Sequence, residues 1–254
     1  MTDLVQRILT KRIPEGGLGV FFMGQAGFLL KSPSGCLLGV DLYLSNCCER
    51  YFGFKRLMPQ LLLPGELVLD ALVASHAHYD HFDVDSVPML LSAPKTHLYT
   101  AADGVTECER LGIPREKYTV LHREKPIRAG DFTILPVDCD HGELAPDALG
   151  LYISCGEKAV YLAGDTCFRE DLARRMSRLP ITLAAAPING AFGNMNSEEA
   201  ARFFDIVRPK LCVPCHYWNF AQHMGDPNAF IEAMGRLPSP PAYLLMYPGE
   251  EICL

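Results

Sequence analysis

Short apolar runs separated by turn residues fill the first part of the chain. Three of them, 18–24 (LGVFFMG), 28–32 (FLLKS) and 36–44 (CLLGVDLYL), predict consecutive strands, with GQAG and SPSG as the turns between them. Residues 42–66 have no regular period. The run 69–76 (LDALVASH) then predicts a buried strand.

Helical patterns precede and follow these strands. The amphipathic N-terminus predicts a short helix capped by Thr2, and Asp83 is placed to cap a helix that ends near residue 91. The apolar face of the N-terminal helix comprises Leu4, Val5, Ile8 and Leu9. Asn196 and Glu199 form a capping-box pattern before a helix over 197–209. The other predicted helices are 102–112, 170–178 and 226–237, and the other predicted strands are 96–100, 117–121, 131–141, 147–156, 158–166, 181–187, 211–216 and 243–254.

The order of these elements predicts an α/β (α+β) fold. Strands come first, strands and helices then mix, and the same order follows a second time. This order predicts two similar halves, each a sheet with helices on its outer side. The chain has 254 residues, of which 49% are hydrophobic and 21% charged. We expect a single domain over residues 1–254, built around one large core.

The charge balance limits the possible partners of the protein. There are 23 Lys and Arg against 30 Asp and Glu, a formal net charge of −7, whereas proteins that bind nucleic acid usually have a basic surplus. The one basic stretch, 169–178, is interpreted as a solvated helix face. The N-terminus resembles neither a signal peptide nor a membrane span. We therefore expect a cytoplasmic protein that binds neither nucleic acid nor membrane.

The ten cysteines include the sequence Cys212-x-x-Cys215-His216, which has the spacing of a c-type haem attachment site. A haem would need an exported chain, and a redox-active thiol pair would need a helix N-terminus. This stretch is instead an apolar run that contains Pro214 and is typical of a strand. With a period of two, Cys212, Pro214 and His216 share one side, while Val213 and Cys215 take the other. The two cysteines should therefore pack on opposite faces, and in a reducing compartment we expect no disulfide framework.

The strongest chemical signal is the histidine-rich stretch SHAHYDH at 75–81. It places four candidate ligands directly after a buried strand: His76, His78, Asp80 and His81. Imidazole and carboxylate together suit Zn²⁺, Mn²⁺ and Fe. As packing residues, clustered histidines would leave several ring nitrogens without hydrogen bonds. A turn can direct His76 and His78 to one metal and Asp80 and His81 to a second.

Three more polar residues follow apolar strands. His141 follows the strand at 131–141, Asp165 follows KAVYLAG, and His216 follows LCVPC. Taken singly, each has an ordinary explanation, as a loop histidine, a helix or turn cap, and a histidine at the edge of the core. Taken together, they complete an ordered series: H-x-H-x-D-H, then H, then G-D-T, then H.

This series resembles the metallo-β-lactamase superfamily over nearly the whole chain. The resemblance implies a four-layer αββα sandwich of two mixed sheets with outer helices and metals at one edge between the sheets. Within the superfamily the chain is similar to the branch of the L-ascorbate-6-phosphate lactonase. That similarity is carried by GQAGF at 24–28, VD at 40–41, GDT at 164–166, INGAFGNMNSEEAA at 188–201 and PCHYWNF…DP at 214–227.

The resemblance also implies a ligand set for two divalent ions, Zn²⁺ or Mn²⁺ rather than Fe. One ion would be bound by His76, His78 and His141. The second ion would be bound by Asp80, His81 and His216. Asp165 would bridge the two ions, and Asp41 would orient the histidine loop from behind.

The implied function is metal-dependent hydrolysis by a hydroxide held between the two metals. The expected small-molecule substrate is a small lactone or ester, with a phosphorylated sugar lactone such as L-ascorbate 6-phosphate as one candidate. Asp80 and His81 are the expected catalytic residues, with Asp80 exchanging protons with the water or leaving group. Candidate substrate-binding residues lie in loops near the predicted metals: Asn189, Asn194, Tyr217, Trp218 and Asn219. For these five, turn formation and packing remain equally good explanations.

Two other functions would fit the same motif. A phosphodiesterase or nuclease on this fold would have the same ligand series, although the acidic net charge disfavours it. A non-hydrolytic di-iron redox protein would usually have more carboxylate ligands and a flavin partner domain. The sequence is compatible with a homo-oligomer. Three histidines, His97, His122 and His223, fit no ligand position and are interpreted as surface or core residues.

Overall fold

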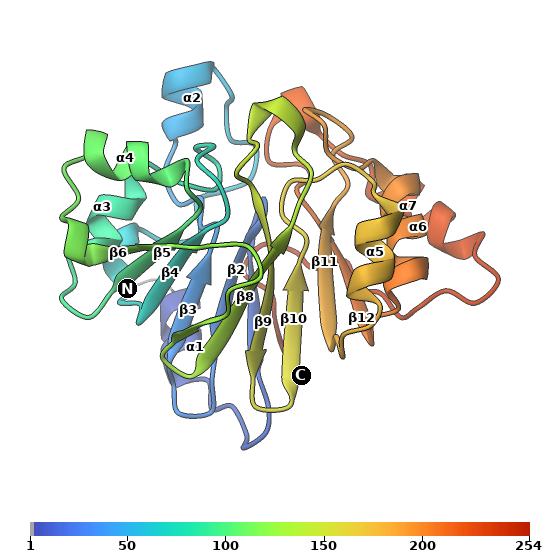
Figure 1. The fold of residues 1–254 in the computed structure, drawn as a ribbon, viewed down its shortest axis with the longest axis horizontal. Coiled ribbons are helices and arrows are strands. Elements are labelled where there is room, and N and C mark those ends of the chain that lie inside the picture. Colours follow the sequence, from blue (N-terminus) through green and yellow to red (C-terminus); the bar gives the residue numbers. More distant parts are fainter. Residues whose placement is uncertain (1–2) are drawn as a thin grey trace.

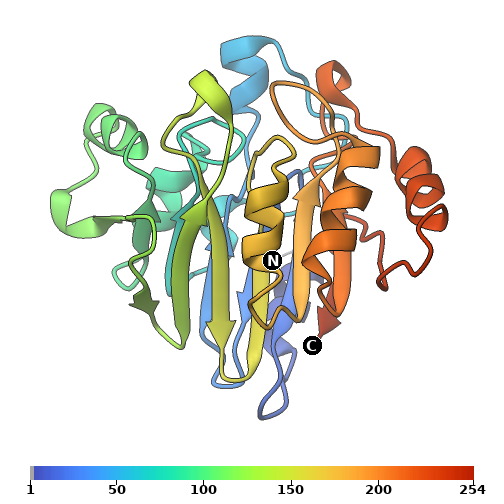
Figure 2. The same ribbon diagram turned by 45° about the vertical axis from the view of Figure 1, so that its right-hand side comes forward.

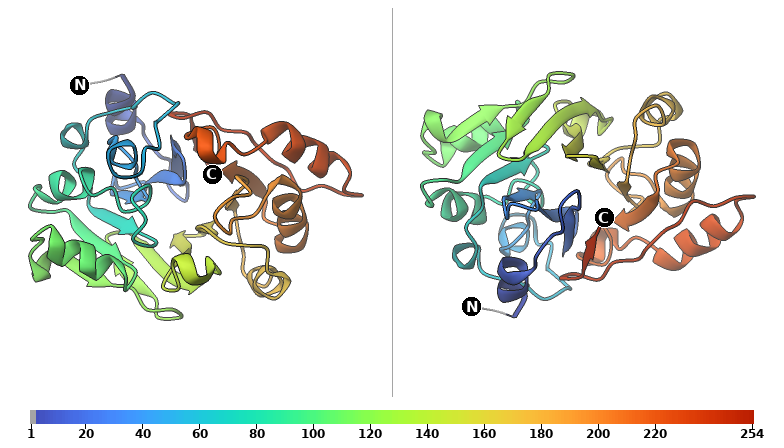
Figure 3. Two further views of the ribbon diagram at one scale, coloured as in Figure 1. Left: turned by 90° about the horizontal axis from the view of Figure 1, so that it is seen from above. Right: turned by 90° about the horizontal axis from the view of Figure 1, so that it is seen from below.

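Two mixed β-sheets face each other, and helices cover the outer side of each sheet (Figure 1). The computed structural model describes residues 3–254, so Thr2, the expected cap of the first helix, lies outside the described residues. The arrangement has four layers, with helices, sheet, sheet and helices in turn (Figure 3). This confirms the αββα fold class that the sequence predicts.

The first sheet combines antiparallel and parallel strands. Within the described residues its order is β13 (Glu251–Cys253), β1 (Gly19–Gly24), β2 (Gly27–Lys31), β3 (Leu37–Val40), β4 (Ala71–Ala74), β5 (His97–Thr100) and β6 (Tyr118–Val120). Pairing is antiparallel from β13 to β3 and parallel from β3 to β6. The parallel strands point their carboxyl ends toward the upper edge of the sandwich in Figure 1.

The second sheet repeats this combination. Its order is β12 (Leu211–Cys215), β11 (Leu183–Pro187), β10 (Lys158–Leu162), β9 (Leu149–Cys155), β8 (Phe132–Asp138) and β7 (Ile127–Ala129). Pairing is antiparallel from β7 to β10 and parallel from β10 to β12. Each half of the chain therefore forms an antiparallel part that continues into parallel strands, as the order of the predicted elements suggested.

Helices and apolar side chains fill the remaining layers. The first sheet is covered by α1 (Asp3–Thr10), α2 (Cys47–Phe52), α3 (Ser86–Leu91) and α4 (Gly104–Arg110). The second is covered by α5 (Glu170–Met176), α6 (Ser197–Val207) and α7 (Pro227–Gly235), which lie together in Figure 2. Short 3₁₀ helices occur at η1 (Pro64–Glu66), η2 (Arg115–Lys117), η3 (Gly142–Leu144) and η4 (Ala221–His223). Among the helices of residues 3–254, none has the length and apolar character needed to cross a membrane.

Several boundaries differ from the sequence prediction. The expected strand 36–44 ends at Val40, because Asp41 has a φ of +49° and turns the chain out of the sheet. The stretch expected to be irregular contains α2, and the final predicted strand is reduced to β13. Leu9, expected on the apolar face of α1, is 47% exposed, whereas Leu4, Val5 and Ile8 are buried. Local pattern alone did not resolve these short elements, whose positions depend on tertiary packing.

A buried lysine attaches the first helix to the first sheet. Lys31 at the end of β2 donates from Nζ to the carbonyl oxygens of Ile8 and Leu9, at 2.6 and 2.9 Å. These carbonyls belong to the last turn of α1, where a cation is favoured by the helix dipole. These hydrogen bonds attach the C-terminal end of α1 to β2.

Asp83 stabilises the loop that follows the histidine-rich stretch. Its carboxylate accepts hydrogen bonds from the backbone amides of Leu44, Ser45 and Ser86, at 2.7–3.1 Å, and from the hydroxyl of Ser86 at 2.7 Å. Helix α3 begins at Ser86, so the expected capping role of Asp83 is carried out from three residues before the helix. The same carboxylate joins this helix to the segment after β3.

Replacing Asp83 should destabilise the protein strongly. We expect Asp83→Asn to lower the free energy of unfolding by roughly 3 kcal/mol, because the amide cannot accept all of these buried hydrogen bonds. Urea denaturation followed by circular dichroism measures this change. Asp171→Asn is the control, because Asp171 pairs with Arg169 at an exposed position and should leave the midpoint nearly unchanged. Equal midpoints for both variants would contradict this role of Asp83.

Candidate metal centre

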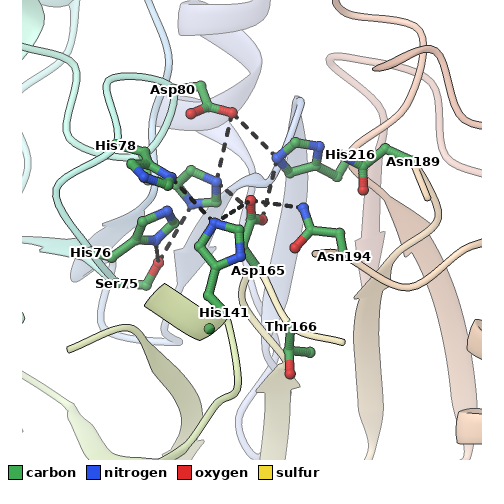
Figure 4. Close-up of polar contacts among 12 residues, drawn as sticks. Ser75, His76, His78, Asp80, His141, Asp165, Thr166, Asn189, Asn194 and His216 are labelled. Atoms are coloured by element: carbon green, nitrogen blue, oxygen red, sulfur yellow. Dashed lines mark hydrogen bonds and ion pairs between the residues drawn. The ribbon is translucent and has the colours of Figure 1, made fainter. Parts of the chain in front are cut away.

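The seven predicted ligands come together at one edge of the sandwich (Figure 4). The group from His76 to His81 follows β4 of the first sheet. The second sheet supplies His141 after β8, Asp165 after β10 and His216 after β12. Each residue follows the carboxyl end of its strand, so the fold brings four separate loops to a common point between the sheets.

The side chains form overlapping groups with the spacing of metal ligands. One group is His76, His78 and His141, and a second is Asp80, His81 and His216. A third group, His76, His81 and Asp165, connects them. Within each group the potential ligand atoms all lie within 4.8 Å of one another. The first two groups are the two three-residue ligand sets that the sequence predicted.

Asp165 has the geometry of a bridging residue. Its Oδ1 lies 3.2 Å from Nε2 of His81 and 3.2 Å from Nε2 of His216. Its Oδ2 lies 3.7 Å from Nε2 of His141 and accepts a hydrogen bond from Nδ2 of Asn194 at 2.8 Å. One carboxylate oxygen thus faces the second ligand group, and the other faces the first.

Several atoms of this cluster are buried without a hydrogen bond. Within the described residues, no hydrogen-bond partner is found for Nε2 of His76, Nε2 of His81 or Oδ1 of Asp165. Buried polar atoms without partners are costly and uncommon in native proteins. Divalent cations would satisfy them, and a set of five imidazoles and two carboxylates suits Zn²⁺ or Mn²⁺. The residues present therefore fit a divalent metal centre.

Burial and mutual charge set the protonation of the cluster. Burial lowers the pKa of His76 well below its usual value, and the neighbouring His81 lowers it further. Burial opposes ionisation of Asp165, but His216 and His81 outweigh it and hold the pKa of that carboxyl well below its usual range. Burial likewise opposes the charged form of His216, yet Asp165 and Asp80 raise the pKa of that imidazole to about 9. The carboxylates are therefore anionic at neutral pH, which is the form that binds metals.

Comparison with known proteins identifies the family of this arrangement. The sequence profile of the β-lactamase superfamily domain matches residues 43–217, which is more than half of the chain. The chain belongs to the metallo-β-lactamase superfamily. It is 29% identical over 238 residues to a UPF0173 metal-dependent hydrolase of Pyrobaculum islandicum, covering 91% of this chain and 97% of that relative.

Solved structures of the metallo-β-lactamase fold resemble the whole chain. Igni18, a metallo hydrolase of Ignicoccus hospitalis, has a TM-score of 0.73 at 21% identity, with 94% of this chain and 98% of that chain covered. CmlA, a diiron β-hydroxylase of Streptomyces venezuelae, has a TM-score of 0.72 at 13% identity, with 96% of this chain and 54% of that chain covered. Proteins with different named reactions thus share this fold, so the site must decide the function.

Asp41 lies directly behind the histidine loop, where the superfamily resemblance predicted it. Its Oδ2 is 2.9 Å from Nδ1 of His81 and accepts from the hydroxyl of Ser75 at 2.7 Å. Its Oδ1 accepts from the backbone amide of Ser75 at 2.7 Å. These contacts direct Nε2 of His81 toward the cluster, as a buried carboxylate behind a metal-binding histidine does.

Gln25 is a contact residue that sequence reasoning interpreted only as part of a turn. Its Nε2 donates to Oδ2 of Asp80 at 2.8 Å, and its backbone oxygen accepts from the amide of His216 at 2.7 Å. Gln25, Asp41 and His216 all have positive φ, at 53°, 49° and 59°. Such backbone strain in non-glycine residues is concentrated at functional sites. The side-chain contact depends on the approach of the β1–β2 turn to β12, which the local sequence does not reveal.

A glycine explains the G-D-T sequence around Asp165. Gly164 has a φ of +70°, and a Cβ at this position would lie 2.7 Å from the carbonyl oxygen of Leu149. Only glycine allows this close approach to β9. Thr166 then accepts from the amide of Asp140 at 3.0 Å, which joins the Asp165 loop to the His141 loop.

A cavity of about 570 Å³ opens beside the ligand cluster. Of the candidate substrate-binding residues, Asn189 and Asn194 line it, whereas Tyr217, Trp218 and Asn219 do not. The hydroxyl of Tyr217 donates to the carbonyl oxygen of Met246, and Asn219 is buried with its backbone oxygen bonded to the amide of Leu57. The positive φ of His216 and of Trp218 turns this segment away from the cavity.

His223 is a polar residue of the cavity that the sequence did not indicate. It had been interpreted as a surface or core histidine, but it lines the cavity with Nδ1 3.4 Å from Nδ2 of Asn189. Burial lowers its pKa to about 4. Aromatic side chains make up much of the remaining lining: Phe52, Phe54, Tyr79, Phe192 and Phe220.

The Cys212–His216 stretch forms β12 and the turn after it. Cys212 packs in the helix-covered layer and Cys215 between the sheets, so the two cysteines lie on opposite faces as predicted. His216 does not continue the alternation with Cys212, because its φ of +59° ends the strand and turns the ring to the cluster. All ten cysteines, which lie within the described residues, are free thiols.

The two cysteines should be dispensable for metal binding. We expect the double variant Cys212→Ala and Cys215→Ala to retain the metal content of the wild type, because neither thiol is part of a ligand group. His216→Ala should reduce it by about one ion per chain, since it removes one of three ligands of the second group. Elemental analysis after gel filtration measures both. Loss of metal in the cysteine variant alone would contradict this assignment.

Gln25 should strengthen metal binding by the second ligand group without being a ligand itself. We expect Gln25→Ala to weaken binding of the second metal by about 10–100-fold, the usual effect of removing a residue that orients a ligand. Titration with a metal-sensitive chelator measures the affinity. Gln6→Ala, a change at an exposed position of α1, is the control. If both variants bind metal as tightly as the wild type, Gln25 does not orient Asp80 in the way inferred.

Proposed function

We propose that this protein is a metal-dependent hydrolase of a small carboxylic ester or lactone. The observation that carries the proposal is the cluster of five imidazoles and two carboxylates, five of whose seven residues line a cavity. Membership of the metallo-β-lactamase superfamily and the name of the Pyrobaculum relative support a metal-dependent hydrolase. The resemblance of residues 188–201 to the L-ascorbate-6-phosphate lactonase branch favours a lactone or ester as the reacting group.

In the proposed enzyme each ligand group would hold one metal ion. His76, His78 and His141 would hold one ion, and Asp80, His81 and His216 would hold the second, with Asp165 between them. When bound, a pair of divalent ions lowers the pKa of a water molecule and polarises the carbonyl of a substrate. No serine or cysteine nucleophile is required for this chemistry.

The protein residues orient the ligands and handle the protons. Asp80 lines the cavity, and Gln25 donates a hydrogen bond to its Oδ2 at 2.8 Å. Burial opposes ionisation of Asp80, but His81 and His216 hold the pKa of this carboxyl below its usual range. The anionic Asp80 would accept a proton from the attacking water and return it to the leaving oxygen. Asn194 keeps Asp165 in place by its hydrogen bond to Oδ2.

Removing a single ligand tests the centre. We expect His78→Ala to lose about one metal ion per chain and to lower kcat/KM by at least about 100-fold, because outer contacts alone are worth 10–100-fold. His97→Ala is the matched control, since His97 lies on β5 and its Nε2 contacts Thr119 instead of the cluster. Metal analysis and steady-state kinetics on a panel of lactones, esters, thioesters and phosphodiesters measure the effects.

Three outcomes would contradict the proposal. Full metal content and full activity of His78→Ala would remove the cluster from the mechanism. Tightly bound iron with a reducible visible spectrum would favour a di-iron redox protein. Activity on phosphodiesters alone, with salt-sensitive binding of RNA, would favour a nuclease.

A further inference from the structure

The cavity next to the ligand cluster has a distinctly apolar wall. It is formed by Phe52, Phe54, Phe192 and Phe220, here called the phenylalanine wall. The ring centroids of Phe54 lie 6.0 Å from Phe192 and 6.0 Å from Phe220, and those of Phe52 and Phe54 lie 6.2 Å apart. The wall therefore runs from the surface to the buried ring of Phe220.

Part of this wall is exposed to water. Phe52 is 55% exposed, Phe192 49% and Leu144, on the opposite loop η3, 57%. Exposed apolar side chains grouped at the mouth of a cavity are typical of a ligand-binding site, because covering them releases water from apolar surface. An apolar group of the substrate that covers these side chains would stabilise the complex.

Phe192 is held in the wall by an unfavourable backbone conformation. It has a φ of +53°, which is rare for a bulky side chain, between Gly190 and Gly193 with φ of +62° and +83°. A strained residue of this kind persists where its surroundings fix it and is often functional. Its ring meets His223 edge-on, with centroids 5.5 Å apart, so the loop extends the wall to the polar end of the cavity.

Among its described lining residues, the cavity lacks the long cationic side chains that would pair with a phosphate or carboxylate group of a substrate. None of the described residues that line it is a lysine or an arginine, the side chains that most often bind such groups. Two arginines, Arg50 and Arg56, flank Phe52 and Phe54 in the sequence, but their side chains contact other groups. Arg50 pairs with Asp85 at 2.6 Å, and Arg56 donates to the carbonyl oxygen of Tyr43 at 2.9 Å.

We infer that the substrate is a neutral small molecule with an aromatic or branched alkyl group, which packs on the phenylalanine wall while its ester or lactone carbonyl lies at the ligand cluster. This inference rests on the proposed function and specifies its substrate class. It replaces the phosphorylated sugar lactone with an uncharged, apolar substrate. The wall sets specificity, and the cluster performs the reaction.

The direct test compares substrates that share a reacting group and differ only in the attached group. For the metal-loaded, full-length protein we expect kcat/KM for γ-phenyl-γ-butyrolactone to exceed that for phosphorylated γ-hydroxymethyl-γ-butyrolactone by at least about tenfold. The same order should hold for phenethyl acetate against 2-phosphoryloxyethyl acetate. Equal or better hydrolysis of the phosphorylated compounds would overturn the inference and leave the hydrolase proposal intact.

Variants of the wall link this preference to particular side chains. Phe192→Ala and Phe54→Ala should each lower kcat/KM for the phenyl substrates by about tenfold, mainly through KM, with metal content unchanged. Phe192→Leu should keep most of the activity, because it keeps an apolar side chain. Tyr247→Ala, which removes an aromatic ring that is 63% exposed outside the cavity, should match the wild type. Leu144→Arg should improve kcat/KM for the phosphorylated compounds. Unchanged values in all wall variants would overturn the inference.

A binding measurement separates the two proposals. N-phenyl-1-naphthylamine is neutral, and its fluorescence rises in apolar sites. We expect it to bind the metal-loaded protein and to bind Phe192→Ala and Phe54→Ala at least about tenfold more weakly. Binding of this kind without hydrolysis of any compound would sustain the apolar site and contradict the hydrolase. If the probe does not bind and the hydrolysed substrates show no preference, the inference of an apolar substrate is overturned, while the hydrolase proposal stands.

Discussion

The structure at the active edge depends on the balance between buried carboxylates and buried imidazoles. Asp165 is 4% exposed, and both of its neighbours His81 and His216 are almost fully enclosed. An isolated buried carboxylate would be costly, and so would a group of charged imidazoles. Together they form a compact set in which anionic and cationic forms compensate one another. A bound cation would take over that compensation, which couples metal binding to the integrity of the edge.

The scaffold behind this cluster is built to hold it in one geometry. Asp41 fixes His81 from the rear, Gln25 fixes Asp80, and Asn194 fixes Asp165. These supporting residues lie on different loops, so the two sheets must face each other correctly before any ligand is oriented. The positive φ angles of Gln25 and Asp41 indicate that the surrounding fold imposes these positions against the local preference of the chain.

In the proposed enzyme, two surfaces of the cavity would share substrate recognition. The ligand cluster provides the charged, reactive side, and the phenylalanine wall provides the apolar side. The superfamily resemblance implied the ligand series, whereas the loops around Phe54 and Phe192 form the apolar side of the cavity. Substrate choice in such an arrangement follows from the loops, because the reactive side is compatible with many carbonyl or phosphoryl compounds.

The sequence alone determined the fold class, most of the strands and helices, and the seven candidate ligands. The elements follow from apolar periods, which are local patterns, whereas the αββα class and the full ligand set were implied by the resemblance of the ordered His and Asp series to the superfamily. The tertiary structure decided which loop residues reach the cavity. His223 and Phe192 line it and Gln25 reaches Asp80 beside it, while Tyr217 and Trp218 turn away. No local pattern encodes these outcomes, since they depend on left-handed backbone turns and on the approach of loops distant in sequence.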